Sequence, residues 1–197
     1  MPRNRGNQSG RRSLQRKVAI RSPPKTLDLR VEPRREGAVP LTLISMAADA
    51  RGKAIDEEAE IDEFWCVFDV EWPINHPNLH DALDRARRND IQLAISNPCF
   101  ELWLILHFQD QDGWLDNQQA SRIRRRLDGS SDKGLDPAKY MPLIKDAASR
   151  ATRLEERHRR NDTRFPHDNP SSSMFRLLSA VGPTGWGPPS VVGEGAG

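Results

Sequence analysis

Apolar residues along this chain recur at two spacings, one typical of strands and the other typical of helices. In "LDLRVEP" (27–33) every second residue is apolar, which predicts a strand. Pro40 then opens a segment whose apolar residues form a helical stripe as far as Ala48. "FWCVF" (64–68) is continuously apolar, as expected for a strand that is covered on both faces of a parallel sheet.

The same alternation continues through the middle of the chain. "NLHDALDRARRND" (78–90) has helical spacing, "IQLAIS" (91–96) predicts the next strand, and "PCFELWLILHF" (98–108) predicts the next helix. Three consecutive strand–helix units favour an α/β fold with an open, mainly parallel sheet, flanked by helices and joined by right-handed crossovers.

The C-terminal part is predicted to be helical after Asp110, and clearly so from about residue 115. Asp136 is expected to cap a helix that begins at Pro137, and an apolar stripe continues from there to Leu154. Pro142 interrupts this stripe, which indicates either a kink or a later helix start. "SSSMFRLLSAV" (171–181) predicts a last short helix.

The two ends of the chain differ from the middle in composition. Residues 1–26, rich in Arg, Ser, Gly and Pro, are predicted to be a disordered basic arm, and residues 182–197 a disordered Gly/Pro-rich tail. The net charge of +2 hides an asymmetry, because residues 1–36 hold eleven Lys and Arg against three acidic residues, which leaves +8. Residues 27–181 are then expected to form one domain.

Several classes of protein are disfavoured by what the sequence lacks. No stretch reaches the roughly 18 apolar residues of a membrane span, and no apolar signal core begins the chain. Cys66 and Cys99 stand in apolar surroundings, which favours reduced core thiols of a cytoplasmic protein over a disulfide. The chain has no Walker loop, nucleophile elbow or Gly-rich dinucleotide turn, which argues against nucleotide hydrolysis and hydride transfer.

Acidic residues follow two of the predicted strands at their carboxyl ends. Asp69 and Glu71 come after strand 64–68, and if the chain stays extended their side chains point the same way. Asn97 and Glu101 follow strand 91–96, with Asn97 expected as the N-cap of the next helix. Ligands bind outside the carboxyl ends of such sheets, and paired carboxylates suit Mg²⁺. The alternative is that Asp69 and Glu71 are simply polar residues that follow a strand, and that Glu101 is an acid stabilised by the helix dipole.

Other polar and aromatic residues have two interpretations each. His107 ends an apolar run and is interpreted as a hydrogen-bonded histidine rather than a metal ligand. His76 and His80 are four residues apart, but a zinc pair is disfavoured because His76 lies in a Pro-flanked loop. The tryptophans are interpreted as packing residues rather than a base-stacking platform, and the arginine run at 122 and 124–126 as a solvated helix face rather than a phosphate-binding site.

Three segments together resemble the RloB-like family of bacterial phage-defence proteins over residues 27–181. They are "EFWCVFDVE", "IQLAISNPCFELWLILHF" and "NPSSSMFRLLSAV", and the second is the most specific. The resemblance implies a Toprim-like α/β domain, Mg²⁺-dependent (or Mn²⁺-dependent) cleavage of nucleic acid, and an AAA-type ATPase encoded nearby as a partner. By position it implies Asp69 and Glu71 as metal ligands, with Asn97 and Glu101 as catalytic residues.

One part of the family pattern is missing from this sequence. Members usually have a first strand ending in a Cys-Glu-Gly-Glu type turn, whose glutamate is the expected general acid/base or an extra metal ligand. Here "RSPPKTLDLRVEP" passes directly from the basic arm into what resembles the second strand, and residues 1–26 contain no acid. This departure predicts a weakened fold and reduced or absent catalysis.

Two functions therefore remain open. The first is a metal-dependent Toprim-like nuclease, whose basic arm attracts phosphates through Arg11, Arg12, Arg16 and Lys17. The second is a non-catalytic subunit of a defence system that binds nucleic acid or the ATPase. The sequence does not decide between DNA and RNA, or between a monomer and a homo-oligomer.

Overall fold

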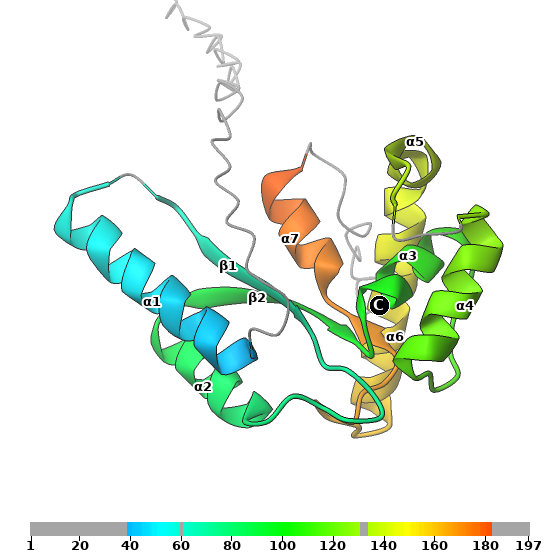
Figure 1. Ribbon diagram of the computed structural model, residues 1–197, viewed down its shortest axis with the longest axis horizontal. Helices are drawn as coiled ribbons and strands as arrows, with labels where there is room; N and C mark the ends of the chain where they lie inside the picture. The colour runs from blue at the N-terminus through cyan, green and yellow to red at the C-terminus, as the bar shows by residue number, and fades with distance from the viewer. Residues whose placement is uncertain (1–38, 60, 131–133, 183–197) are drawn as a thin grey trace, which may run out of the picture. The chain divides into compact units, whose positions relative to one another are not determined.

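The computed structural model describes residues 39–59, 61–130 and 134–182 (Figure 1). All of these described residues belong to one compact unit of the chain. The expected strand at 27–33, the basic arm and the tail from 183 onward lie outside the described residues. Among the described residues, no helix combines the length and the apolar character that crossing a membrane requires.

The strand–helix alternation expected for residues 40–108 is confirmed. Five elements follow one another along this part of the chain: helix α1 (Pro40–Asp56), strand β1 (Phe64–Asp69), helix α2 (Leu79–Arg88), strand β2 (Ile91–Asn97) and helix α3 (Phe100–Phe108). Strands β1 and β2 pair in parallel, from Phe64 opposite Ile91 to Asp69 opposite Ser96. Because this register is level, both strands end at the same edge of the sheet.

The rest of the described chain is mostly helical, as expected. It comprises α4 (Asn117–Asp128), α5 (Pro137–Tyr140), a 3₁₀ turn (Met141–Leu143), α6 (Ile144–Arg160), β3 (Ser171–Ser172) and α7 (Met174–Val181). Asp136 caps α5 through the N–H of Ala138, as expected. Pro142 lies in the 3₁₀ turn that separates α5 from α6, so a later helix start is the correct interpretation.

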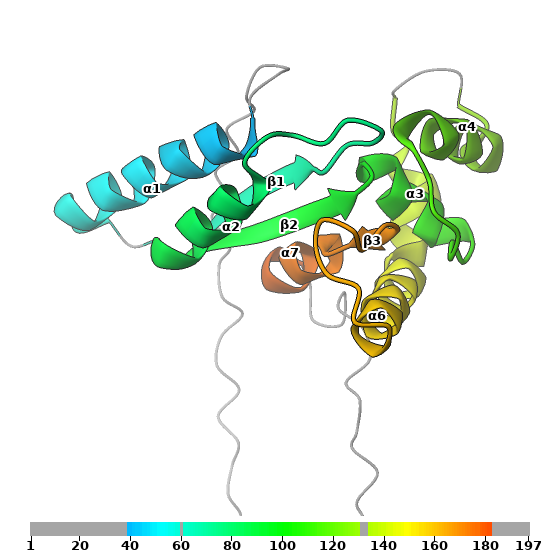
Figure 2. The same ribbon diagram turned by 90° about the horizontal axis from the view of Figure 1, so that it is seen from below.

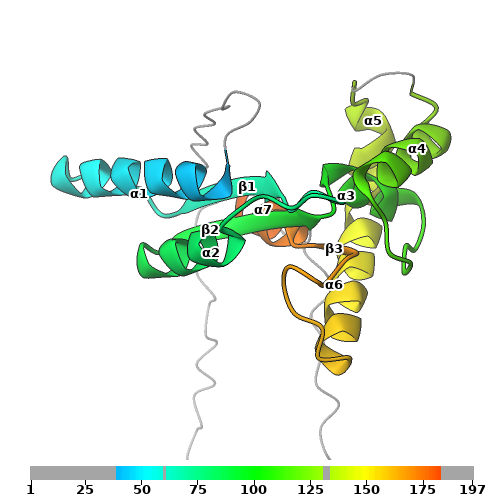
Figure 3. The same ribbon diagram turned by 60° about the horizontal axis from the view of Figure 1, so that its bottom comes forward.

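Two apolar clusters cover the two faces of β1 and β2. On one face α1 and α2 bury residues such as Ile44, Phe68 and Ala82, and on the other α3, α6 and α7 enclose a second cluster with Ala94 and Leu102. Figure 2 shows α7 on the opposite side of the strands from α1 and α2, and Figure 3 shows α3, α4 and α6 gathered beyond the strand ends. The mixed α/β fold is therefore confirmed, with a sheet of only three strands among the described residues.

The third strand was not expected, because two serines carry no hydrophobic pattern. Ser172 pairs antiparallel with Ser96, and their hydroxyl oxygens lie 3.1 Å apart in the core. Ser173 adds to this pairing by donating its main-chain N–H to the carbonyl of Ile95, at 2.9 Å. Segment 171–173 is thus attached to the sheet by hydrogen bonds.

His107 is confirmed as a hydrogen-bonded core histidine. Its ring is 3% exposed and lies edge-on to Trp103 and Tyr140. Nδ1 lies 2.9 Å from the main-chain oxygen of Trp103, and because a carbonyl only accepts, Nδ1 carries the hydrogen. Burial lowers the pKa of His107, so the neutral ring is the form that the core accommodates.

Candidate functional site

The start of α3 was placed two residues too early by the sequence interpretation. The helix begins at Phe100 rather than Pro98, and its N-cap is Cys99, which has extended backbone (φ −155°, ψ 170°) and no capping side chain. Asn97 is therefore not the N-cap. Glu101 does lie in the first turn, as expected, as the second residue of the helix.

Asp69, at the tip of β1, faces the beginning of α3. The main-chain N–H of Phe100 is a hydrogen-bond donor to its carboxylate. Burial raises the pKa of Asp69 to about 7; the Phe100 N–H works against this rise, and the charges of Glu101 and Glu71 add to it. Asp69 is thus a partly buried carboxyl group in a field of like charge.

Glu101 has two contacts that hold its carboxylate in this cluster. The hydroxyl of Ser121, on α4, donates to its Oε1 at 3.3 Å. The thiol of Cys99 also lies near Glu101, and burial together with the nearby negative charge raises the pKa of that thiol well above its usual range. Cys99 is therefore a protonated thiol here rather than a nucleophile.

Glu71 does not continue the strand, so the expectation that it points the same way as Asp69 is wrong. Its backbone is left-handed (φ 65°), and its N–H donates to the carbonyl of Pro98 at 2.8 Å. The carboxylate lies 3.7 Å from Nε2 of His76. Glu71 still acts on the pKa of Asp69 through its charge.

Asn97 is fully buried and all of its side-chain polar atoms have partners. Its Oδ1 accepts from Nε1 of Trp72 at 2.8 Å. Its Nδ2 donates to the carbonyl of Pro166 at 2.8 Å and to Asp168 at 2.9 Å. This geometry ties the end of β2 to two loops, which is a positioning role, and its predicted catalytic role stays a prediction.

The structure therefore brings Asp69 and Glu101 close enough for their charges to interact. Glu71 also acts on Asp69 through its charge, but its carboxylate lies beside His76. The side chain of Asn97 is hydrogen-bonded to other residues. The described residues contain no group of three or more His, Cys, Asp or Glu arranged to hold a metal ion. The nucleic-acid-binding residues predicted in the arm, Arg11, Arg12, Arg16 and Lys17, lie outside the described residues.

Two residues of this cluster were not identified as such from sequence. Cys99 was interpreted only as a core thiol, and its free, buried state confirms that part. Ser121 carries no local signal, because its hydrogen bond with Glu101 depends on how α4 packs against α3. Within the arginine run, Arg124 is buried in an ion pair with Asp128 at 2.7 Å, so the prediction of a solvated face is wrong for this residue.

Comparison with known proteins identifies the family. A family model described as RloB-like protein matches residues 9–181, which begins earlier than the resemblance at residue 27. We found no match to the chain among curated proteins or among solved structures. Because the family model spans most of its length, the chain belongs to the RloB-like protein family.

Proposed function

We propose that this protein is a divalent-cation-dependent nuclease, with its centre at Asp69 and Glu101. The observation that carries the proposal is the partly buried carboxyl of Asp69 at the carboxyl edge of two parallel strands. The charged groups that act on its pKa are two further carboxylates, Glu101 and Glu71. A cation would compensate this accumulated negative charge, and such sheet edges are common ligand sites.

The residues present fit Mg²⁺ or Mn²⁺ as a site of two carboxylates. Mg²⁺ is commonly held by one or two carboxylates, with waters and substrate phosphates completing its shell, so a cluster of three protein ligands is not required. When bound, the ion would neutralise charge on a phosphodiester and lower the pKa of a bound water. Asp69 would be one ligand, and Glu71 a second if its carboxylate turned away from His76.

Glu101 has a different part in the proposal. Ser121 donates a hydrogen bond to its carboxylate and the protonated thiol of Cys99 lies nearby, and both would restrict its orientation. An oriented carboxylate at this place would accept a proton from the attacking water. Asn97 would act indirectly, since its amide holds the strand end from which the Cys99–Glu101 turn departs.

Cleavage assays on single- and double-stranded DNA and RNA test this function. We expect cleavage with Mg²⁺ or Mn²⁺, loss of cleavage on chelation, and at least a hundredfold lower rate in Asp69→Asn. Asp84→Asn, on the exposed face of α2, is the matched control and should cleave like the wild type. Wild-type protein that cleaves none of the four substrates, or Asp69→Asn protein that cleaves normally, would overturn the proposal.

A binding subunit without catalysis is the second candidate. The left-handed turn at Glu71 favours it, because the carboxylate of this potential ligand lies beside His76. Titration calorimetry with Mg²⁺ alone separates the two candidates. A nuclease should bind the ion through Asp69, so its heat of binding should be lost in Asp69→Asn. Equal heats in the wild type and in Asp69→Asn would favour the binding subunit.

The proposal includes the partners that the family resemblance implies. Nucleic acid would be attracted by Arg11, Arg12, Arg16 and Lys17, and an AAA-type ATPase would form a complex with the chain in the cytoplasm, where the free thiols of Cys66 and Cys99 would stay reduced. Replacing the four basic residues by glutamine should weaken DNA binding. It should also reduce the slope of log affinity against log salt by about 0.7–0.9 for each phosphate that is no longer neutralised. Co-purification with the ATPase from the same locus tests the other partner.

A further inference from the structure

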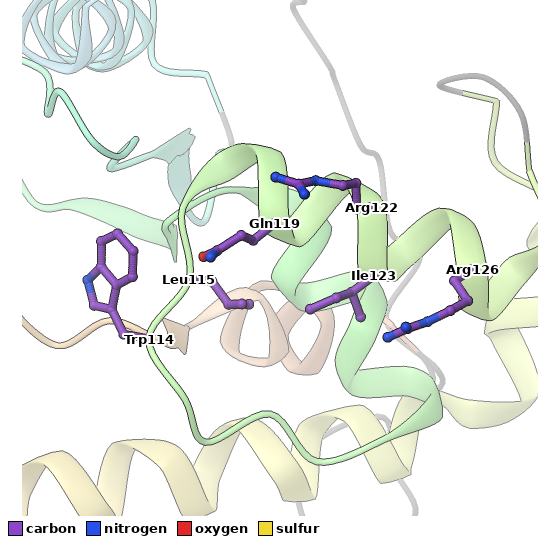
Figure 4. A pocket seen from close by; sticks show the side chains of 6 residues that line it. All are labelled: Trp114, Leu115, Gln119, Arg122, Ile123 and Arg126. Atoms are coloured by element: carbon purple, nitrogen blue, oxygen red, sulfur yellow. The ribbon is translucent and has the colours of Figure 1, made fainter.

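A pocket of about 330 Å³ lies between α4 and the loop that precedes it, and it does not include the acidic cluster. It is lined by Trp114, Leu115, Gln119, Arg122, Ile123 and Arg126 (Figure 4). The last four residues follow the spacing i, i+3, i+4, i+7, so they form one stripe along α4. The volume is at the lower end of the roughly 300–1000 Å³ typical of small-ligand pockets.

Trp114 is exposed although its backbone is fixed. Its side chain is 52% exposed, and one edge contact, to Trp72 at 5.9 Å between ring centroids, holds the ring. The next residue, Leu115, exchanges two hydrogen bonds with the buried amide of Asn169, at 3.2 and 2.7 Å. A large aromatic ring held half in solvent on an anchored loop offers a face for stacking.

The charged side chains that line the pocket are both positive. Arg122 and Arg126 are one turn apart, both are exposed, and within the described part of the chain neither forms an ion pair. Arg122 donates to the carbonyl of Gln118 on its own helix. Two like charges at this spacing destabilise a helix slightly, and an anion between them would reverse that effect.

Gln119 supplies a neutral donor beside these charges. Its Oε1 accepts the N–H of Asp116 in the capping box of α4, at 2.9 Å. Its amide nitrogen is therefore the end that can face a ligand. Figure 4 shows the ends of Gln119 and Arg122 extending toward the side of the pocket where Trp114 stands.

We infer that this pocket binds one unpaired nucleotide of a nucleic acid strand, with its base on Trp114 and its phosphate between Arg122 and Arg126. The choice of a nucleic acid strand as ligand rests on the proposed function. Helix α4 also bears Ser121, which contacts Glu101, so the same helix borders both the pocket and the acidic cluster. A strand seated on α4 would lead toward Asp69.

Fluorescence anisotropy with a labelled oligothymidylate, in chelator so that no cleavage occurs, tests the inference. Trp114→Ala should weaken binding roughly tenfold, and Trp114→Phe should restore most of it. Arg122→Gln and Arg126→Gln should each weaken binding severalfold and reduce the salt slope by about 0.7. Arg125→Gln is the matched control, since it removes an exposed arginine of the same helix that does not line the pocket.

The outcomes separate this inference from the nuclease proposal. Binding in chelator does not depend on a metal, so the Trp114 and pocket-arginine variants should lose affinity whether or not the wild-type protein cleaves any substrate. Wild-type affinity in the Trp114 and pocket-arginine variants would overturn the pocket, as would an equally large decrease in affinity in Arg125→Gln. If free thymidine monophosphate binds as tightly as the oligonucleotide, the conclusion that the ligand is a nucleic acid strand is wrong.

Discussion

The hydroxyl oxygen of Ser121 lies 3.3 Å from Oε1 of Glu101, and this hydrogen bond joins α4 to the first turn of α3. Ser121 acts through Glu101 rather than on a substrate, so it is a positioning residue. Its hydroxyl restricts a carboxylate that the Cys99 thiol also contacts. Both groups restrict Glu101, whose charge in turn acts on Asp69 at the tip of β1.

Ser121→Ala should lower the cleavage rate severalfold while KM changes little, because the substitution loosens Glu101 without removing a group that binds substrate. The free energy of unfolding should fall by about 1 kcal/mol, the usual contribution of one hydrogen bond. Steady-state kinetics and urea denaturation measure the two effects. Ser121→Thr keeps the hydroxyl and should recover the rate; a threonine variant as slow as the alanine variant would argue against the hydrogen bond.

The raised pKa of Asp69 makes stability depend on pH in a defined direction. Between the ordinary value of 3.8 and about 7 the folded protein holds a proton that the unfolded chain has released. The free energy of unfolding should therefore fall as pH rises through this window, by at most roughly 4 kcal/mol from this group, and level off above it.

Asp69→Asn isolates this contribution from that of other groups. Asparagine has no proton to lose, so the variant should match the wild type near pH 4 and be more stable at pH 8. Urea denaturation across this pH range gives the difference curve. Equal stability of the two proteins at pH 8 would contradict a destabilising charge at this position.

Asn97 is not the N-cap that the sequence predicted, and its role can be tested directly. Asn97→Ala leaves Trp72, Pro166 and Asp168 without their amide partner, so the free energy of unfolding should fall by about 3 kcal/mol. Asn161→Ala, exposed at the end of α6, should cost less than about 0.5 kcal/mol. If the role is positioning, folded Asn97→Ala protein at low temperature keeps measurable cleavage; complete loss with an intact fold would support direct catalysis.

The sequence predicted strands β1 and β2 and most helices because their signals are local. The apolar runs at 64–68 and 91–96 and the proline at 137 are recognisable without knowing the fold. The convergence of Asp69 and Glu101 followed from one topological rule, that parallel strands end at one edge. By contrast, the turn at Glu71 depends on its N–H reaching Pro98, and the hydrogen bond of Ser121 depends on helix packing. No spacing in the sequence encodes either.

A buried hydrogen-bond and ion-pair network joins α4, which lines the pocket, to α5, and its contribution to stability can be predicted. The hydroxyl of Tyr140 donates to Asp128 at 2.5 Å, and Arg124 pairs with the same carboxylate. Tyr140→Phe should lower the free energy of unfolding by about 2 kcal/mol, since a hydrogen bond to a charged group is removed. Asp128→Asn should cost more, about 3–5 kcal/mol, because it leaves the buried guanidinium of Arg124 without that carboxylate.

Asp84→Asn is the control for this comparison, because it makes the same substitution in an exposed ion pair, with Arg87. Exposed pairs contribute at most about 1 kcal/mol, so the two asparagine variants should differ by at least about 2 kcal/mol in urea denaturation. Similar small decreases in both would mean that water reaches Asp128 and that the network does not fix α4. Retained stability in Tyr140→Phe together with a large decrease in Asp128→Asn would assign the effect to the ion pair alone.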